Sequence, residues 1–276
     1  MDETILDEYA RHAEETARGA GAILRERFGQ PHEIRFKGAI DLVTDADRAA
    51  EDLIARRLRE ACPDHELLCE EGSLGASLPS TYRWVVDPLD GTTNFAHGLP
   101  TFAVSIALEA SGIPVIGVVY DPMRDELFTA RRGQGALLNG VPIRVSNTDA
   151  LISSILVTGF SYDFARRAHQ AEIWRDFLTR VQAIRQTGSA ALNLCYIAAG
   201  RLDGYWERGI QPWDVAAGAL MVVEAGGTVS DLAGGVYRSD DREILASNGP
   251  LHNQLLAVIG RHPFGDAPPA TVQLGA

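Results

Sequence analysis

The spacing of hydrophobic residues in the first part of the chain predicts two amphipathic helices. Between residues 3 and 28 apolar side chains recur every three or four positions, and Gly29 ends the run. A short strand and a second helix are predicted in "IDLVTDADRAAEDLIARRLREACP", with Thr44 as N-cap and Pro63 beyond the helix end. The segment "ELLCEEGS" is typical of a short strand that runs into a loop.

The middle of the chain has the pattern of consecutive β-strands. Turn dipeptides and glycine clusters separate three runs rich in β-branched and aromatic residues, "TFAVSIALEA", "IPVIGVVYD" and "DELFTARRG". Short turns between such runs favour antiparallel pairing. We therefore expect an antiparallel meander beside the two N-terminal helices.

After about residue 150 predicted strands and helices alternate. Helices are expected over residues 164–182 and 189–199 and in "WDVAAGALMVVEAGG", and strands in "SSILVTGF", "RLDGYWE", "GTVSDL" and "EILAS". Such alternation indicates an α/β arrangement with some parallel pairing. The expected organisation is an N-terminal α+β half over residues 1–145, a C-terminal α/β half with a mixed sheet over 146–262, and a flexible tail over 263–276.

The charge balance limits the partners of the protein. Its 276 residues contain 25 Lys and Arg against 37 Asp and Glu, a formal net charge of −12. This argues against a nucleic acid partner, which requires a basic surface, but an anionic small substrate stays compatible if a metal ion reverses the local field. The three cysteines are scattered, as in a cytoplasmic protein with reduced thiols. We expect neither a signal peptide nor a membrane span.

The stretch "WVVDPLDGTTNF" places Asp87 and Asp90 where a predicted strand ends. Asp-Pro and Asp-Gly are common turn dipeptides, so one explanation is a turn that needs Asp for its shape. The residues Gly91, Thr92 and Thr93 follow. If a helical turn starts there, its free N–H groups favour an anion. The second explanation is a functional site, in which the carboxylates bind cations and the backbone amides bind a phosphate.

Other acidic residues allow a structural and a chemical interpretation. Asp214 opens a predicted helix as its N-cap, a position from which it could also bind a metal. Asp47 lies three residues after Thr44, the spacing of a capping box. Glu70 and Glu71 follow a strand, and a solvated acidic loop is the usual explanation for such a pair. Individually, each acid is explained without a metal.

If these acids lie close together in the folded protein, bound cations are needed to offset their repulsion. Two unit charges 4 Å apart repel by about 4 kcal/mol at an effective dielectric constant near 20. Ligands that are all carboxylates indicate Mg²⁺, with Mn²⁺ as the other candidate. No His or Cys has the spacing of a zinc site.

Taken together, "DLVTDAD", the "EEGS" loop, "WVVDPLDGTTNF" and "WDVAAGALMVVEAGG" resemble the inositol monophosphatase family in order and spacing, from about residue 5 to 262. The resemblance implies a layered α-β-α-β-α sandwich and a homodimer. It also implies Mg²⁺-dependent, lithium-sensitive hydrolysis of phosphate monoesters by water, without a phosphoenzyme. Inositol monophosphate is the favoured substrate.

The same resemblance implies roles for individual residues. A first Mg²⁺ would be held by Glu70, Asp87 and the carbonyl of Leu89, and a second by Asp87, Asp90 and Asp214; a third ion is possible through Glu70. Catalytic roles fall to Glu70, to Thr92 and to Asp47 behind it. Substrate contacts are implied for Gly91, Thr92, Asp90, Ala190, Glu207, Asp214 and Lys37.

Several alternatives stay open. The haloacid dehalogenase superfamily uses Asp-x-Asp, whose acids share one face of a strand, whereas Asp87 and Asp90 are three apart. Related phosphatases act on histidinol phosphate or nucleotides and carry a basic residue after Gly-Thr, where this chain has Thr93 and Asn94. Fructose 1,6-bisphosphate is another candidate substrate. A non-catalytic binding or regulatory homologue is the alternative of a different class.

Overall fold

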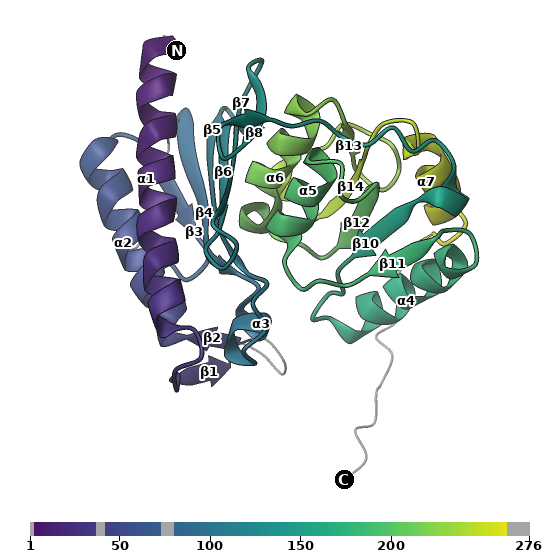
Figure 1. Cartoon of the computed structure of the whole chain (residues 1–276), viewed down its shortest axis with the longest axis horizontal. Coiled ribbons are helices and arrows are strands. Elements are labelled where there is room, and N and C mark those ends of the chain that lie inside the picture. Colours follow the sequence, from purple (N-terminus) through teal and green to yellow (C-terminus); the bar gives the residue numbers. More distant parts are fainter. Residues whose placement is uncertain (1–2, 37–41, 73–79, 264–276) are drawn as a thin grey trace.

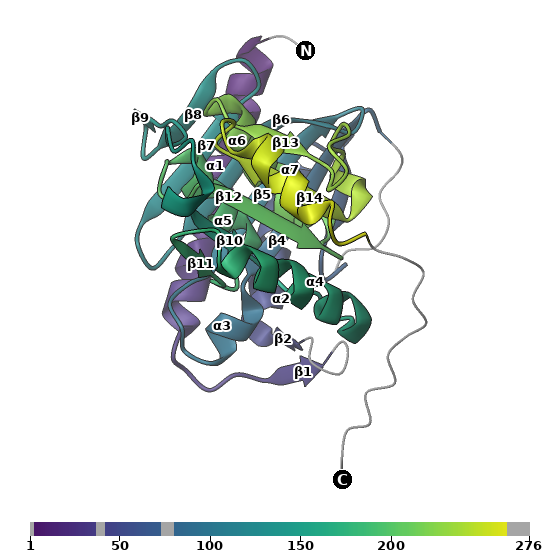
Figure 2. The same cartoon turned by 90° about the vertical axis from the view of Figure 1, so that its right-hand side faces the viewer.

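A computed structural model describes residues 3–36, 42–72 and 80–263 of the chain. Its elements form alternating layers (Figure 1), with the first two helices outside a seven-stranded sheet, two helices between the sheets, and two helices outside a five-stranded sheet. This confirms the predicted α-β-α-β-α sandwich. The view from the side shows α4 and α7 covering the outer face of the second sheet (Figure 2).

The N-terminal sheet has the strand order β3-β4-β5-β6-β7-β8-β9. Its pairs are antiparallel as predicted, except that β3 runs parallel to β4. The strands are β3 (Glu66–Cys69), β4 (Tyr82–Asp90), β5 (Ala103–Ala110), β6 (Ile113–Asp121), β7 (Glu126–Arg131), β8 (Gly135–Leu138) and β9 (Val141–Pro142). A separate antiparallel pair, β1 (Ile34–Phe36) and β2 (Leu42–Thr44), precedes them.

The central strands of this sheet are buried on both faces. Trp84, Val86 and Ile106 pack with α1 (Glu3–Arg27) and α2 (Asp45–Ala61). The alternating residues Val85 and Ala107 pack with the helices on the other face. Strands covered on both sides need apolar residues at successive positions rather than at every second one, which explains the continuous hydrophobic runs in the sequence.

The C-terminal sheet is mixed, as predicted, with the order β11-β10-β12-β14-β13. The strand β10 (Ile155–Thr158) pairs in parallel with β11 (Ala183–Arg185) and β12 (Gly204–Arg208); β14 (Glu243–Ser247) is antiparallel to β12 and β13 (Thr228–Ser230). The predicted helix over 164–182 ends earlier, as α4 (Phe164–Leu178), because the following residues lead into β11. The helix α7 (His252–Ile259) and the strands β1 and β11 were not predicted.

Two helices, α5 (Ala190–Ala198) and α6 (Pro212–Glu224), fill the layer between the sheets. Small residues allow α6 to approach its neighbours closely. A Cβ on Gly117 of β6 would lie 2.8 Å from the carbonyl oxygen of Ala217, and one on Gly218 would lie 2.5 Å from Cβ of Leu194. This close packing brings the starts of α5 and α6 to the end of β4, where the acidic motif lies.

The remaining expectations have different outcomes. None of the helices within the described ranges is long and apolar enough to cross a membrane. The cysteines Cys62, Cys69 and Cys195 are free thiols. The division of the chain near residue 145 stays a prediction. Apart from Pro263, the expected flexible tail lies outside the described residues, and so does Lys37.

Candidate active site

A β-bulge at the end of β4 explains the spacing of Asp87 and Asp90. Asp87 lies opposite Ser105 of β5, and Asp90 lies opposite Ala103, so β4 contains one residue more than its partner between these pairs. On a regular strand, residues three apart point to opposite faces. The extra residue bends the strand and redirects a side chain, and both carboxylates therefore reach the same pocket.

Asp214 approaches this pair from the start of α6. Carboxylate oxygens of Asp87, Asp90 and Asp214 all lie within 4.8 Å of one another. The prediction that Asp214 is an N-cap is wrong, because Gln211 is the cap and Pro212 follows it; Asp214 is the third residue of the helix and accepts a hydrogen bond from the Gln211 N–H at 2.9 Å. Proline suits the first helical position because that residue needs no N–H donor.

The start of α5 orients Asp90. The Ser189 hydroxyl and the Ala191 N–H (2.8 Å) donate to Oδ2 of Asp90, and the Ala190 N–H (3.2 Å) donates to Oδ1. A helix N-terminus stabilises an adjacent carboxylate through its free N–H groups and its dipole. One acid of the N-terminal sheet is thus held in place by the start of α5, about a hundred residues further along the chain.

Thr92 begins the short helix α3 (Thr92–Ala96), with Gly91 as its N-cap. The Thr92 hydroxyl lies 2.9 Å from Oδ1 of Asp47 and 3.0 Å from the carbonyl oxygen of Leu89. Gly91 has φ +99°, and a Cβ there would lie 3.0 Å from the Thr101 carbonyl oxygen, so only glycine fits this turn. The turn after Asp90 therefore directs the Thr92 hydroxyl toward the acids.

Asp47 uses its two oxygens for two different partners. Its Oδ2 accepts hydrogen bonds from the Thr44 N–H at 2.8 Å and from the Thr44 hydroxyl at 2.6 Å, which completes the predicted capping box of α2. Its Oδ1 faces Thr92. Burial raises the pKa of Asp47, and the hydrogen bonds from Thr44 and Thr92 oppose that shift. Helix capping and the orientation of Thr92 are compatible in one side chain.

Asp87, Asp90 and Asp214 line a pocket of about 570 Å³, whose other walls come from the ends of β10 and β12 and the starts of α3, α5 and α6. Glu207 of β12 also lines it and accepts a hydrogen bond from the Tyr205 hydroxyl at 2.6 Å. Burial raises the pKa of Glu207 to about 7. The predicted residues that line this pocket are Glu70, Asp87, Leu89, Asp90, Gly91, Thr92, Ala190, Glu207 and Asp214.

Burial, and after it mutual repulsion, disfavours the charged forms of the acids in the pocket. Burial and the charge of Glu70 raise the pKa values of Asp87 and Asp214 well above the usual range. Burial also raises the pKa of Asp90, to about 6, against its hydrogen bonds from the start of α5. A divalent cation would relieve this repulsion, and a donor set of carboxylate oxygens suits Mg²⁺ or Mn²⁺. The residues present therefore fit a metal site.

These shifts predict a pH-dependent effect of Mg²⁺ on stability. Because the folded pKa values exceed the unfolded value near 3.8, the metal-free native state binds more protons than the unfolded chain, and its stability falls as the pH rises from about 4 through 6 and above. Mg²⁺ at about 100 times its dissociation constant should raise the melting temperature by roughly 5–10 °C at pH 8. At the same Mg²⁺ concentration, calorimetry at pH 5 should show a smaller rise in the melting temperature, because protons compete with the ion for the acids. Equal rises at both pH values would contradict this prediction.

Ser189, Asn94 and Arg167 are among the pocket residues that were not predicted as site residues. Ser189 precedes α5 and accepts a hydrogen bond from the Leu192 N–H, and a serine before an apolar helix is a recognisable N-cap signal. Asn94 and Arg167 also line the pocket. Neither carries a local signal, because their importance depends on what the fold brings next to them.

Comparison with known proteins supports a common origin. Residues 5–263 match the inositol monophosphatase family. The chain is 45% identical to the inositol-1-monophosphatase of Synechocystis over 94% of this chain and 91% of the relative. It is also 45% identical to the Nus factor SuhB of Escherichia coli, over 87% and 91%. The inositol monophosphatase structure from Anabaena superimposes with a TM-score of 0.84 at 41% identity, over 94% of this chain and 97% of that one.

Proposed function

The chain belongs to the inositol monophosphatase family, and we propose that it hydrolyses inositol monophosphate, using Mg²⁺ and a water molecule. The class of enzyme is that of its relatives, a phosphoric monoester hydrolase. The observation that carries the proposal is the convergence of Asp87, Asp90 and Asp214 within 4.8 Å, in a pocket that also contains Glu70 and Thr92.

The acids would hold the metal ions that act on the scissile phosphate. Glu70, Asp87 and the Leu89 carbonyl would bind one Mg²⁺, and Asp87, Asp90 and Asp214 a second, with a third ion possible through Glu70. When bound, Mg²⁺ supplies positive charge that stabilises the attacking and leaving oxygens of an in-line displacement. The chain itself supplies no nucleophile in this proposal.

Orientation of the water is the task of Thr92. Its hydroxyl donates to Asp47 or to Leu89 in the geometry described, and its lone pairs can then accept a hydrogen bond from a water in the pocket. The backbone N–H groups of Gly91 and Thr92 lie at the start of α3 and would donate hydrogen bonds to phosphate oxygens. The water and the phosphate would thereby both be held by one short turn of the chain.

A direct test is phosphate release from a panel of monoesters with and without Mg²⁺. We expect Mg²⁺-dependent release that is fastest with inositol 1-phosphate, and inhibition by lithium. Absence of metal-dependent release from every monoester would instead favour a binding role. That alternative has some support, because the Escherichia coli relative is named a Nus factor rather than an enzyme.

Glu207 is proposed to bind hydroxyl groups of the polyol, together with the backbone at Ala190. Replacing Glu207 with Gln keeps the size of the side chain and a partner for Tyr205, but removes the charged acceptor. At about pH 8, above the raised pKa of Glu207, a hydrogen bond to this charged group is worth about 1.5–3 kcal/mol, so KM for inositol 1-phosphate should rise by about 10-fold or more. KM for 4-nitrophenyl phosphate, which lacks these hydroxyls, serves as the control and should stay within about twofold.

A bisphosphorylated sugar is the second candidate substrate. Among the described residues that line the pocket, Arg167 is the only one with a basic side chain, and its Nε donates to the Ser161 carbonyl at 3.0 Å. Its terminal nitrogens suit a second anionic group. Selective loss of fructose 1,6-bisphosphate turnover in Arg167→Gln, with inositol 1-phosphate turnover retained, would favour this candidate.

The remaining properties proposed for the protein are a homodimer, a cytoplasmic location and no partner nucleic acid or membrane. The net charge of −12 supports the absence of nucleic acid binding. Sedimentation analysis at several concentrations tests the dimer.

A further inference from the structure

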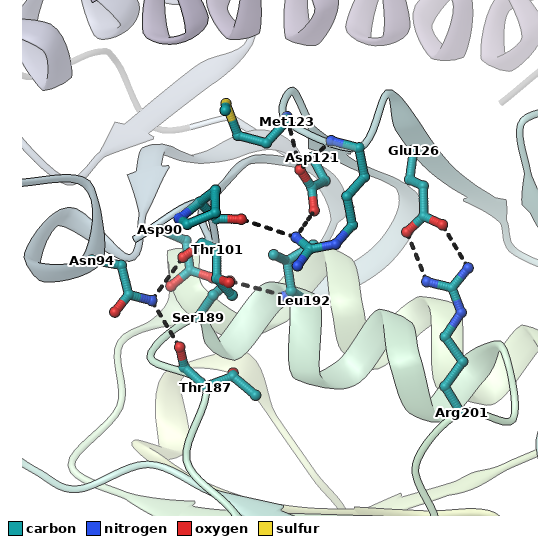
Figure 3. A network of polar contacts seen from close by, with 12 residues as sticks. Asp90, Asn94, Thr101, Asp121, Met123, Glu126, Thr187, Ser189, Leu192 and Arg201 are labelled. Carbon is teal, nitrogen blue, oxygen red and sulfur yellow. Dashed lines mark hydrogen bonds and ion pairs between the residues drawn. The ribbon is translucent and has the colours of Figure 1, made fainter. Parts of the chain in front are cut away.

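The side chain of Asn94 connects the two halves of the molecule beside the acids. Its amide nitrogen donates to the carbonyl oxygens of Thr101 and Thr187, each at 2.7 Å. Thr101 precedes β5 of the first sheet, and Thr187 belongs to the segment between β11 and α5 (Figure 3). Asn94 is only 9% exposed, so both hydrogens of its amide are used inside the protein.

The segment that Asn94 holds is the one that orients Asp90. Two residues after Thr187, Ser189 donates its hydroxyl to Asp90, and the N–H groups of Ala190 and Ala191 add two further hydrogen bonds. The Thr187 hydroxyl bonds to Oδ1 of Asn193 within α5 at 2.5 Å. A shift of Thr187 would therefore move the donors that hold the Asp90 carboxylate.

Packing around Asn94 leaves no space for such a shift. Gly188 has φ +87°, and a Cβ there would lie 2.7 Å from the amide nitrogen of Asn94. On the other side, a Cβ on Gly91 would lie 3.2 Å from the carbonyl oxygen of Gly188. The turn after Asp90 and the turn before α5 are thus in direct contact, and Asn94 supplies hydrogen bonds between them.

We propose that Asn94 is a positioning residue for the metal site, which fixes the start of α5 against the β4 turn so that Asp90 presents its oxygens beside Asp214. The inference rests on the metal-dependent function proposed above. Outer residues that orient a metal ligand typically contribute 10- to 100-fold in metal affinity. If Asn94 has this role, replacing it weakens metal binding by more than the accompanying loss of protein stability explains.

The test compares Asn94→Ala with a matched control. Asn248 is 2% exposed and also uses both amide hydrogens, donating to the Ser146 hydroxyl at 2.9 Å and to the Thr148 carbonyl at 2.7 Å in one distant segment. None of these three residues is among those that line the pocket. Binding of Mn²⁺ to the full chain would be followed by electron paramagnetic resonance, and the melting temperature of each variant by calorimetry.

We expect Mn²⁺ to bind about 10- to 100-fold more weakly to Asn94→Ala, while Asn248→Ala loses stability but keeps wild-type affinity. In kinetics, the Mg²⁺ concentration for half-maximal activity should rise in Asn94→Ala, with kcat partly restored by excess Mg²⁺. Unchanged Mn²⁺ affinity in Asn94→Ala would overturn the inference, and so would an equal loss in both variants. If Asn94→Ala does not fold, Asn94→Ser removes the same donors with a smaller cavity.

The experiments distinguish a failure of the proposed function from a failure of the role of Asn94. If the wild-type chain itself binds no Mn²⁺, both proposals are overturned. If the wild type binds Mn²⁺ and hydrolyses monoesters but Asn94→Ala binds the ion equally well, only the role of Asn94 is overturned. Gly188→Ala approaches the same contact from the other side and should weaken Mn²⁺ binding in the same direction, because the new Cβ displaces the Asn94 amide.

Discussion

Asp214→Asn should lower the turnover of phosphate monoesters by about 10³-fold or more while the protein keeps its fold. The carboxylate lies within 4.8 Å of those of Asp87 and Asp90, and the loss of one charge weakens the site for its proposed cation. Metal charge contributes several kcal/mol to transition-state stabilisation, and about 4 kcal/mol corresponds to 10³-fold. The measurement is kcat with inositol 1-phosphate at saturating Mg²⁺.

The same substitution should stabilise the metal-free protein. The pKa of Asp214 is raised by burial and by Glu70, so the ionised form is unfavourable at neutral pH and the neutral amide removes that cost. The melting temperature without metal at pH 8 should therefore be equal to or higher than that of the wild type. Loss of turnover together with gain of stability is the pattern expected of a functional residue.

Asp203→Asn is the matched control for Asp214→Asn. Asp203 is 6% exposed and lies outside the pocket lining, where it accepts hydrogen bonds from the Ser146 hydroxyl at 2.5 Å and the Ile155 N–H at 2.7 Å. This variant should lose stability and keep its turnover. Near-normal turnover in Asp214→Asn would remove that residue from the site.

Thr92→Val should lower kcat by about 10²- to 10⁴-fold, the range of a positioned group in proton transfer. Valine keeps the shape and branching of the side chain but cannot donate to Asp47 or Leu89, which lie at 2.9 and 3.0 Å from the hydroxyl. KM and the affinity for Mn²⁺ should change little, because the carboxylates are untouched. Thr92→Ser retains the hydroxyl and should recover most of the activity.

The Asp47→Asn variant separates the role of Asp47 in orienting Thr92 from its role in capping α2. It should lower kcat in the same direction, because Thr92 loses its charged acceptor. It should also destabilise the protein by about 1 kcal/mol, because both oxygens of Asp47 accept hydrogen bonds, from Thr44 and from Thr92, and the NH₂ group that replaces one of them cannot accept. At Asp47 this loss exceeds the gain from removing a buried charge. Thr92→Val leaves the capping box of α2 intact and should show the kinetic loss with a smaller loss of stability. An active Thr92→Val variant would contradict the proposed orientation of water.

Much of the fold could be predicted from local patterns. The helices α1 and α2, the meander of β5 to β7 and the alternation after residue 150 all follow from hydrophobic periodicity and turn residues, which act over a few positions. The capping box of Thr44 and Asp47 was also predictable, because both partners lie in one turn. By contrast, β11 is three residues long and depends on pairing with β10, so no local pattern marks it.

The acidic candidates were identified through the resemblance of four motifs to a known family, because each acid by itself also has a structural explanation. Their convergence depends on long-range contacts. The bulge between Asp87 and Asp90 overrides the strand periodicity that would separate their side chains. Ser189 reaches Asp90, and Asn94 meets Thr187, only because the segment before α5 packs against the turn after β4. Residue types and local spacing therefore identify the chemistry that this chain can perform, while the distances that make it feasible arise from packing between segments about a hundred residues apart.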